Sequence, residues 1–272
     1  MTDFEEHVRE YLKAYKDRFN YETMVAGHLD SSRFEDWVNL VSQYKGLEDQ
    51  IVLSSGCGSA GDLMKFLEHG VKAAHGVEID ELLANLARAR LVSTPFAQKA
   101  FIQVYNGGTL PYRDHEFDVV FSMHVIEHTK DPGLYLREAI RVLNQDGILF
   151  LDIPNRYYKM EQHTNLMYIH YLPQSLRDIC ISFLLKSLFC LLFSDDKKYR
   201  LGSLIGMNFF APHQLIEELE IIKMDYQVKI EDAFFHSYDG SKLPFTSFLK
   251  NNYFLKASKK TTFRLVVRRI NS

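Results

Sequence analysis

Ile51-Val-Leu-Ser-Ser-Gly-Cys-Gly-Ser-Ala-Gly-Asp-Leu63 is the stretch of the sequence that decides the fold. Residues 51–53 have the apolar character of a short buried strand, and a helical pattern begins where the stretch ends. Between them, Gly56, Gly58 and Gly61 let the backbone turn sharply and approach a ligand, because glycine has no Cβ. The following helix offers N–H groups and the positive end of its dipole to a polar or anionic ligand. The order of strand, glycine turn and helix predicts a nucleotide-type cofactor site.

The spacing of the glycines leaves the cofactor open. Gly56-x-Gly58-x-x-Gly61 matches a dinucleotide-binding turn, and Glu78 follows about 20 residues later, where such turns place an acid for a ribose. The same spacing also occurs in turns that only connect a strand to a helix. The downstream segments of the chain must therefore distinguish NAD from other ribose-bearing cofactors.

Composition indicates an ordinary globular protein. The 272 residues are 46% hydrophobic and 25% charged, which suits one large domain or one domain with an insertion. The net charge of −3 gives no electrostatic case for a nucleic-acid partner. The acidic N-terminus, residues 1–6, lacks the pattern of a signal peptide, and the three cysteines show neither metal nor disulfide spacing. We expect a cytoplasmic protein without a metal site.

The basic residues gather at the C-terminal end. No Asp or Glu occurs from Lys242 onward, whereas Lys and Arg accumulate there, Arg264 among them. This pattern favours a solvated edge strand over an anion-binding face.

Short apolar runs alternate with helical patterns after the glycine turn. Asp80 and Asp131-Pro132 have the composition of helix starts. We expect strands over residues 71–80, 101–105, 117–121 and 148–152, with helices between them. This alternation predicts an α/β fold with a doubly wound parallel sheet.

Five pieces of the sequence, taken together, resemble the class I S-adenosylmethionine-dependent methyltransferases. They are Ile51–Leu63, Gly76-Val-Glu-Ile-Asp80, Leu110-Pro-Tyr, Phe117-Asp-Val-Val-Phe-Ser-Met-His-Val-Ile-Glu-His128 and the run from Leu136 to Asp152. The Phe-Asp-Val-Val block and the later Leu-Asn-x-x-Gly turn are not expected in NAD-dependent dehydrogenases. The resemblance covers residues 48–155 and implies a Rossmann-like, seven-stranded sheet whose last strand is antiparallel. Residues 226–230 and 262–267 are the natural sixth and seventh strands.

The resemblance also implies a division of the chain. Residues 1–47 form a helical N-terminal arm, and residues 48–155 form the cofactor-binding core. Residues 156–210 form an inserted lid that sets the acceptor, because this connection is long for the fold. Residues 211–272 complete the core with the last two strands.

The resemblance implies S-adenosyl-L-methionine as cofactor and S-adenosyl-L-homocysteine as product. Glu78 would accept hydrogen bonds from the ribose hydroxyls, and Ile79 would pack on the adenine. Asn106 stands where the family often has an Asp that contacts the adenine amino group. The cofactor-binding residues predicted in this way are Gly56, Cys57, Gly58, Glu78, Ile79, Asn106, Gly107, Ser122 and Met123.

Two positions depart from the family pattern. Ser54 replaces the usual acid, which commonly orders the turn and helps to hold the amino group of the cofactor. Ala60 replaces the usual third glycine. These departures leave open an inactive methyltransferase-like protein with a binding or regulatory role.

The chemistry implied is a direct methyl displacement onto a small-molecule, sugar or lipid-like acceptor, with a hydroxyl oxygen expected to receive the methyl. A hydroxyl acceptor requires a base, for which His163, His128 and His124 are the candidates, with a position that only borders the cofactor as the alternative for His124. The apolar run 181–193 is too short to span a bilayer but suits a peripheral membrane contact or an apolar acceptor. An NAD-dependent oxidoreductase is the less favoured alternative.

Overall fold

The computed structural model describes most of the chain. The described residues are 3–16, 21–158, 160–161, 166–187, 198, 201–209, 211–236, 241–244 and 260–270. They include all of residues 48–155 and most of residues 1–47.

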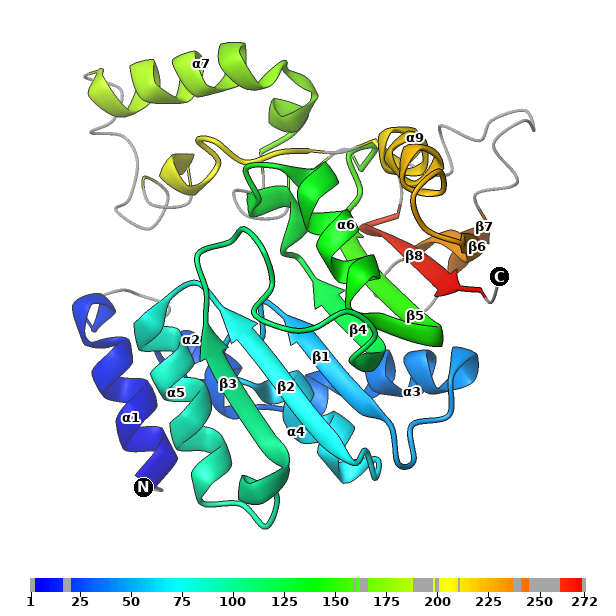
Figure 1. Ribbon diagram of the computed structural model, residues 1–272. Coiled ribbons are helices and arrows are strands. Elements are labelled where there is room, and N and C mark those ends of the chain that lie inside the picture. Colours follow the sequence, from blue (N-terminus) through cyan, green and yellow to red (C-terminus); the bar gives the residue numbers. More distant parts are fainter. Residues whose placement is uncertain are drawn as a thin grey trace.

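A mixed, mostly parallel sheet forms the centre of the protein, with the strand order β3-β2-β1-β4-β5-β8-β6-β7 (Figure 1). Strands β1 to β5 run parallel to one another, and β8 pairs antiparallel with both β5 and β6. The strands are β1 (Ile51–Ser55), β2 (Ala73–Glu78), β3 (Ala100–Val104), β4 (Phe117–Met123), β5 (Leu143–Pro154), β6 (Val228–His236), β7 (Lys242–Pro244) and β8 (Thr262–Arg269).

Helices cover both faces of the sheet (Figure 1). The first two helices of the chain pack outside one of these covering helices. The helices are α1 (Asp3–Tyr11), α2 (Tyr21–Leu29), α3 (Glu35–Tyr44), α4 (Gly61–Glu68), α5 (Glu81–Val92), α6 (Pro132–Arg141), α7 (Gln174–Lys186) and α9 (Pro212–Ile222). Among the described residues, none of these helices is long and apolar enough to cross a membrane.

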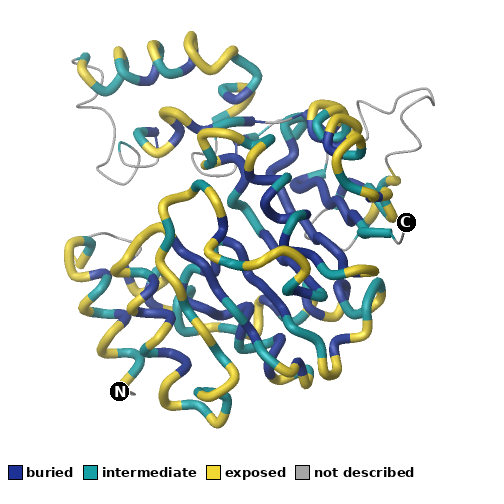
Figure 2. Tube along the Cα trace, in the orientation of Figure 1, coloured by how far each residue is buried: buried dark blue, intermediate teal, exposed yellow. Residues whose placement is uncertain are grey.

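Alternation of side chains along the strands creates two cores, one on each face. Val52 and Ile148 point to α3, α4 and α5, whereas Leu53 and Leu149 point to α6 and α9. A third cluster joins α1 and α2 to α5, so the first two helices of the N-terminal arm pack on a helix, whereas α3 packs on the sheet. The strands at the centre are accordingly the most buried part of the chain (Figure 2).

The predicted helix starts are confirmed. The carboxylate of Asp80 accepts hydrogen bonds from the backbone N–H groups of Leu82 and Leu83, at 2.8 and 3.2 Å. The carboxylate of Asp131 accepts one from Leu134 at 2.9 Å, with Pro132 in the first turn. Each cap satisfies N–H groups that have no partner within the helix and so fixes where the helix begins.

The predicted fold class is confirmed, with one added strand. Beyond the seven expected strands, the three-residue β7 pairs with the far side of β6. The expectation of a solvated edge strand is wrong for Arg264, because β8 lies between β5 and β6 and this side chain is buried. Its position follows from the antiparallel insertion of β8, which a run of basic residues does not reveal.

One buried carboxylate connects the sheet to the N-terminal arm. Asp152 on β5 is fully buried, and its Oδ2 accepts hydrogen bonds from Arg264 Nε on β8, at 3.0 Å, and from Trp37 Nε1 on α3. The Arg264 guanidinium lies 5.4 Å from the centroid of the Trp37 ring. Charge, hydrogen bonds and ring contact thus join β5, β8 and α3 at one point.

We expect Asp152→Ala to lower the free energy of unfolding by about 3–5 kcal/mol, because Arg264 would remain buried without its carboxylate. Urea denaturation monitored by circular dichroism measures this loss. Asp225→Ala is the matched control: it removes the partner of Arg137 in an ion pair whose side chains are 55% and 37% exposed. That surface pair should cost less than about 1 kcal/mol, and equal losses in the two variants would contradict the assignment.

Candidate functional site

The predicted cofactor residues gather at one edge of the sheet. They follow the carboxyl ends of the four neighbouring strands β3, β2, β1 and β4, where parallel sheets bind their ligands. The glycine turn comes after β1, the acid at the end of β2, the Asn-Gly pair after β3, and Ser122 and Met123 end β4. The sheet topology therefore brings these separate segments of sequence to the same place.

The glycine turn is fixed against β2. The backbone N–H groups of Gly56 and Cys57 both donate to the carbonyl oxygen of Val77, at 2.9 and 3.1 Å. Gly56 has a φ of +76°, and a Cβ there would lie 2.4 Å from Val125. Gly58 has a φ of +52°, and a Cβ there would meet no atom within 4 Å. The turn is therefore packed against Val125 at Gly56 and open at Gly58, where a ligand could approach the backbone.

Glu78 connects the end of β2 to this turn. Its carboxylate accepts hydrogen bonds from the backbone N–H groups of Gly58, at 3.1 Å, and of Ile79, at 2.8 Å. The same Oε1 atom that accepts from Ile79 also accepts from the N–H of Asp80 at 3.2 Å, so Oε2 is the oxygen that keeps a second lone pair for a ligand. Ile79 is 62% exposed, and a Cβ on Gly107 would lie 3.8 Å from it. An exposed apolar side chain beside a glycine leaves room for a flat ring.

Two predicted residues are engaged elsewhere in the fold. The side-chain oxygen of Asn106 accepts a hydrogen bond from the N–H of Gly108 at 3.0 Å, which stabilises the turn after β3. The hydroxyl of Ser122 accepts one from Tyr135 on α6 at 2.6 Å. The Ser122 side chain therefore points to the opposite face of the sheet from Met123, as alternation along a strand requires. Met123, in contrast, lines a cavity at the glycine turn.

This cavity has a volume of about 150 Å³. It is bounded by the glycine turn, the ends of β1 and β4, and the N-terminal arm. The residues that line it are His28, Arg33, Phe34, Ser54, Gly56, Cys57, Gly58, Ser59, Gly61, Asp62, Phe121 and Met123. The exposed, cationic Arg33 and the buried, anionic Asp62 thus line the same small cavity.

Asp62 supplies a carboxylate beside Ser54. The Ser54 hydroxyl donates a hydrogen bond to Oδ2 of Asp62, and the N–H of Leu63 donates to Oδ1 at 2.9 Å. Burial raises the pKa of Asp62 to about 6, although both hydrogen bonds oppose the change. The acid missing from β1 is therefore provided by the first turn of α4. Sequence reasoning did not predict this role.

The N-terminal arm covers the glycine turn. His28 of α2 lies 3.2 Å from the Ser59 hydroxyl through Nδ1. Burial, with the nearby charges of Arg33 and Arg90, lowers the pKa of His28 to about 4, so its ring is neutral. Arg90 of α5 donates to the carbonyl oxygens of Ser59, at 2.6 Å, and of His28. This guanidinium fastens the arm to the turn.

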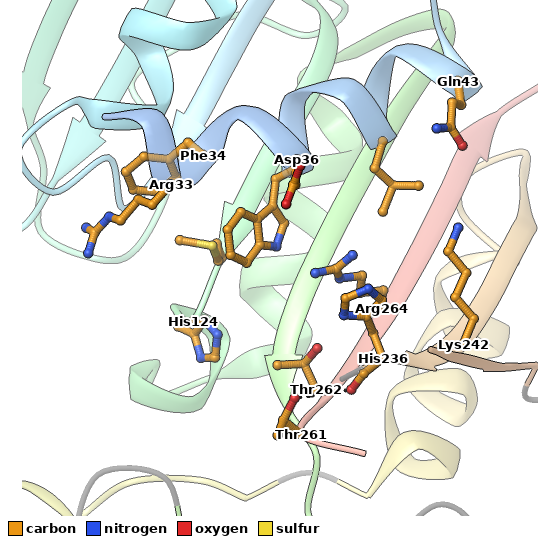
Figure 3. A pocket seen from close by; sticks show the side chains of 13 residues that line it. Arg33, Phe34, Asp36, Gln43, His124, His236, Lys242, Thr261, Thr262 and Arg264 are labelled. Carbon is orange, nitrogen blue, oxygen red and sulfur yellow. Dashed lines mark hydrogen bonds between the residues drawn. The ribbon is translucent and has the colours of Figure 1, made fainter. Parts of the chain in front are cut away.

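A larger cavity of about 450 Å³ adjoins the first (Figure 3). The two cavities share Arg33, Phe34 and Met123. The other residues that line the larger cavity are Asp36, Trp37, Leu40, Gln43, His124, His236, Lys242, Thr261, Thr262 and Arg264. Its volume is that of a small-molecule site, and its walls come from α3 and from β4, β6, β7 and β8.

His124 lines the larger cavity and comes directly after β4, next to Met123, which lines both cavities. It has a φ of +55°, a left-handed conformation that is uncommon for residues other than glycine. Its Nδ1 lies 3.5 Å from Oε1 of Glu127, which is 2% exposed, and neither carboxylate oxygen of Glu127 has a hydrogen-bond partner among the described residues. Burial acts to lower the pKa of His124, but the carboxylates of Glu127 and Asp152 outweigh it and the pKa is raised.

Of the two histidines put forward in the sequence as the main candidate bases, the structure describes His128. His163 lies outside the described residues. His128 ends the short 3₁₀ helix Ile126–His128, is exposed and lines neither cavity. His124, the third candidate base, lines the larger cavity and follows Met123, which lines both cavities.

The described part of the inserted segment, residues 156–210, borders a separate cavity of about 210 Å³. His170, Arg177 and Phe209 are among the residues that line it. Helix α7 lies beyond the carboxyl ends of the parallel strands (Figure 1). Residues 188–193 of the apolar run lie outside the described residues. Among the described residues, no group of three or more His, Cys, Asp or Glu side chains could hold a metal ion.

Comparison with known proteins agrees with this architecture. Residues 53–151 match the family model described as methyltransferase domain. Over 122 residues the chain is 24% identical to ubiquinone biosynthesis O-methyltransferase of Hydrogenovibrio crunogenus, covering 45% of this chain and 50% of that protein. Over 107 residues it is 35% identical to a probable S-adenosylmethionine-dependent methyltransferase of Mycobacterium tuberculosis, covering 39% and 36%. The match thus spans half or less of these relatives.

Among solved structures, an S-adenosylmethionine-dependent methyltransferase from Mesorhizobium loti has the same fold. It superimposes with a TM-score of 0.59 at 13% identity and covers 88% of this chain and 100% of that one. The match to the family model, the relatives and the sheet topology agree in one conclusion. Residues 53–151 are a methyltransferase domain, and the chain has the Rossmann-like fold of S-adenosylmethionine-dependent methyltransferases.

Proposed function

We propose that this protein transfers a methyl group from S-adenosylmethionine to a hydroxyl oxygen of a small-molecule acceptor. The observation that carries the proposal is the pair of adjoining cavities with Met123 between them. The smaller cavity has the groups that suit a cationic amino-acid cofactor, and the larger one has the volume of an acceptor site. The relative named for O-methylation supports the choice of oxygen.

The residues of the smaller cavity fit the cofactor. Asp62 would hold the α-amino group, and Arg33 the α-carboxylate, because each carries the complementary charge. Glu78 and Ile79 would hold the ribose and the adenine. The presence of the Asp62 carboxylate beside Ser54 favours a functional cofactor site over an inactive scaffold. When bound, S-adenosylmethionine supplies a methyl carbon on a positively charged sulfur, which leaves with the electrons of the broken carbon–sulfur bond.

The protein contributes orientation and a proton acceptor. Nδ1 of His124 faces Glu127, so Nε2 is the atom proposed to take the proton of the acceptor hydroxyl. The left-handed backbone at His124 fixes the ring at the end of β4, next to Met123. Phe34 and Met123 keep water from the junction of the cavities, which favours alignment of the reacting groups.

We expect the protein to bind S-adenosylhomocysteine but not NAD in isothermal titration calorimetry. Glu78→Gln should weaken S-adenosylhomocysteine binding by about 1–2 kcal/mol, roughly five- to thirtyfold, because the ribose loses a charged acceptor. Glu81→Gln, an exposed glutamate three residues further along the chain, is the control and should bind as the parent does. Binding of NAD, or of neither nucleotide, would contradict the proposed function.

Binding of S-adenosylhomocysteine should weaken as the pH falls below about 6. The Asp62 carboxylate, with its pKa of about 6, then takes up a proton and loses its attraction for the α-amino group. His28, with a pKa of about 4, stays neutral over this range. Calorimetry between pH 7.5 and 5 should show a loss of roughly three- to tenfold. Asp62→Asn should bind weakly at every pH, and a persistent pH dependence in that variant would assign the effect to another group.

Glu127→Gln should move the titration of His124 to lower pH. The Glu127 carboxylate stabilises the imidazolium form, so removing its charge should lower the pKa of His124. Histidine ring signals in NMR spectra, assigned with His124→Gln, measure the midpoint. His75, whose pKa is lowered by burial, should keep its midpoint in the same spectra. An unchanged titration midpoint for His124 would show that the Glu127 carboxylate does not raise the pKa of His124.

A further inference from the structure

We propose that the larger cavity binds a flat acceptor through an anionic group, a carboxylate or a phosphate, held by Arg264 and Lys242. This inference rests on the proposed function, since it names the class of acceptor for the same site. The acceptor would place its anionic group at the β7–β8 end of the cavity and its hydroxyl at the His124 end. The cavity is built mainly by the N-terminal arm and the last three strands, and not by the described part of the inserted segment.

The guanidinium group of Arg264 lines the cavity and is held in a fixed orientation by its neighbours. Its side chain is 7% exposed and is held through Nε by Asp152 on one side, with the Trp37 ring 5.4 Å away. No hydrogen bond from its two terminal amino groups to another described residue occurs, and the side chain lines the cavity (Figure 3). A guanidinium fixed in this way loses little freedom when its remaining edge binds two oxygen atoms of one ligand group.

The charged groups around the guanidinium of Arg264 are mainly positive. Lys242 of β7 lines the same end of the cavity, and the Lys260 ammonium donates to Ser241, one residue before it. Burial lowers the pKa of His236, and Arg264, Lys242 and Lys260 lower it further, so this ring adds no charge. The one acid that lines the cavity, Asp36, is exposed on α3. Asp152 already neutralises the charge of Arg264. The remaining excess of positive charge therefore comes chiefly from Lys242, Lys260 and Arg33.

The other walls are apolar and partly aromatic. The apolar residues that line the cavity are Trp37 and Leu40 of α3, Phe34 just before this helix and Met123 of β4. The Thr262 hydroxyl also lines the cavity and has no hydrogen-bond partner among the described residues. A cation at one end, apolar walls and a histidine at the other end match a hydroxylated aromatic or unsaturated acid. The hydroxyl would then face His124, and the anion would face Arg264.

Trp37 is the only tryptophan of the sequence, so its fluorescence reports on this cavity alone. The experiment titrates the protein with benzoate, phenyl phosphate and the neutral benzamide, with and without saturating S-adenosylhomocysteine. We expect a saturable change in Trp37 emission with at least one anion, and at least about tenfold weaker binding of benzamide. Benzoate and phenyl phosphate distinguish a carboxylate from a phosphate. Equal affinity for benzamide, or no saturation with either anion, would overturn the proposal.

Two variants locate the effect at the cationic end. Arg264→Gln should weaken anion binding about tenfold or more, and Lys242→Gln about threefold. Lys242 is exposed on a short edge strand, so its variant tests the site even where Arg264→Gln is poorly folded. Lys229→Gln, on the same sheet but at the other end of β6, is the matched control and should bind like the parent. Unchanged anion affinity in Lys242→Gln and in a folded Arg264→Gln would refute the assignment.

Calorimetry with S-adenosylhomocysteine on the same variants separates this inference from the proposed function. Lys242→Gln should bind S-adenosylhomocysteine as the parent does, because Lys242 lines only the larger cavity. Normal nucleotide binding without a response to anions would overturn the acceptor class alone. Failure of nucleotide binding in the parent protein would overturn the proposed function itself.

Discussion

The carboxylate of Asp152 is the constraint on which the arrangement of this protein depends. It is fully buried and accepts from Arg264 and Trp37, which are 112 and 115 positions away in the chain. A buried carboxylate without such partners would be costly, so the burial of Asp152 requires β8 and α3 to meet at this point. The same contact that satisfies the charge also builds a wall of the larger cavity. Packing and site geometry therefore have one physical origin.

The smaller cavity shows how a charge can be kept while its position changes. The family pattern places an acid on the first strand, and here that position holds Ser54. The Ser54 hydroxyl instead donates a hydrogen bond to Asp62, which lies eight residues later in the first turn of α4. Both arrangements put a buried carboxylate at the same end of β1. The position of the charge in space, and not the position of the residue in the sequence, is what a cationic ligand would recognise.

Local features of the fold could be predicted from the sequence, and contacts between distant residues could not. Asp80 and Asp131 act on N–H groups two or three residues away, so their role as helix caps is visible in the order of residues. Glu78 lies at a strand end and contacts the glycine turn through the adjacent strand, which the β-α-β pattern implies. The roles of Arg264 and Trp37 depend on which strand β8 inserts beside. A basic run alone is compatible with a solvated edge, and only the antiparallel pairing of β8 with β5 buries this arginine.

The two cavities have opposite electrostatic requirements, and their separation explains the position of His124. A sulfonium cofactor is favoured by the carboxylate of Asp62, whereas an anionic acceptor is favoured by Arg264 and the lysines. Close contact of these groups would let them neutralise one another, so the polar ends must lie apart with apolar side chains between them. Phe34 and Met123 occupy that intermediate region. The imidazole of His124, which follows Met123 in the chain and lies near the Glu127 carboxylate, is the group proposed to take up a proton where the two ligands would meet.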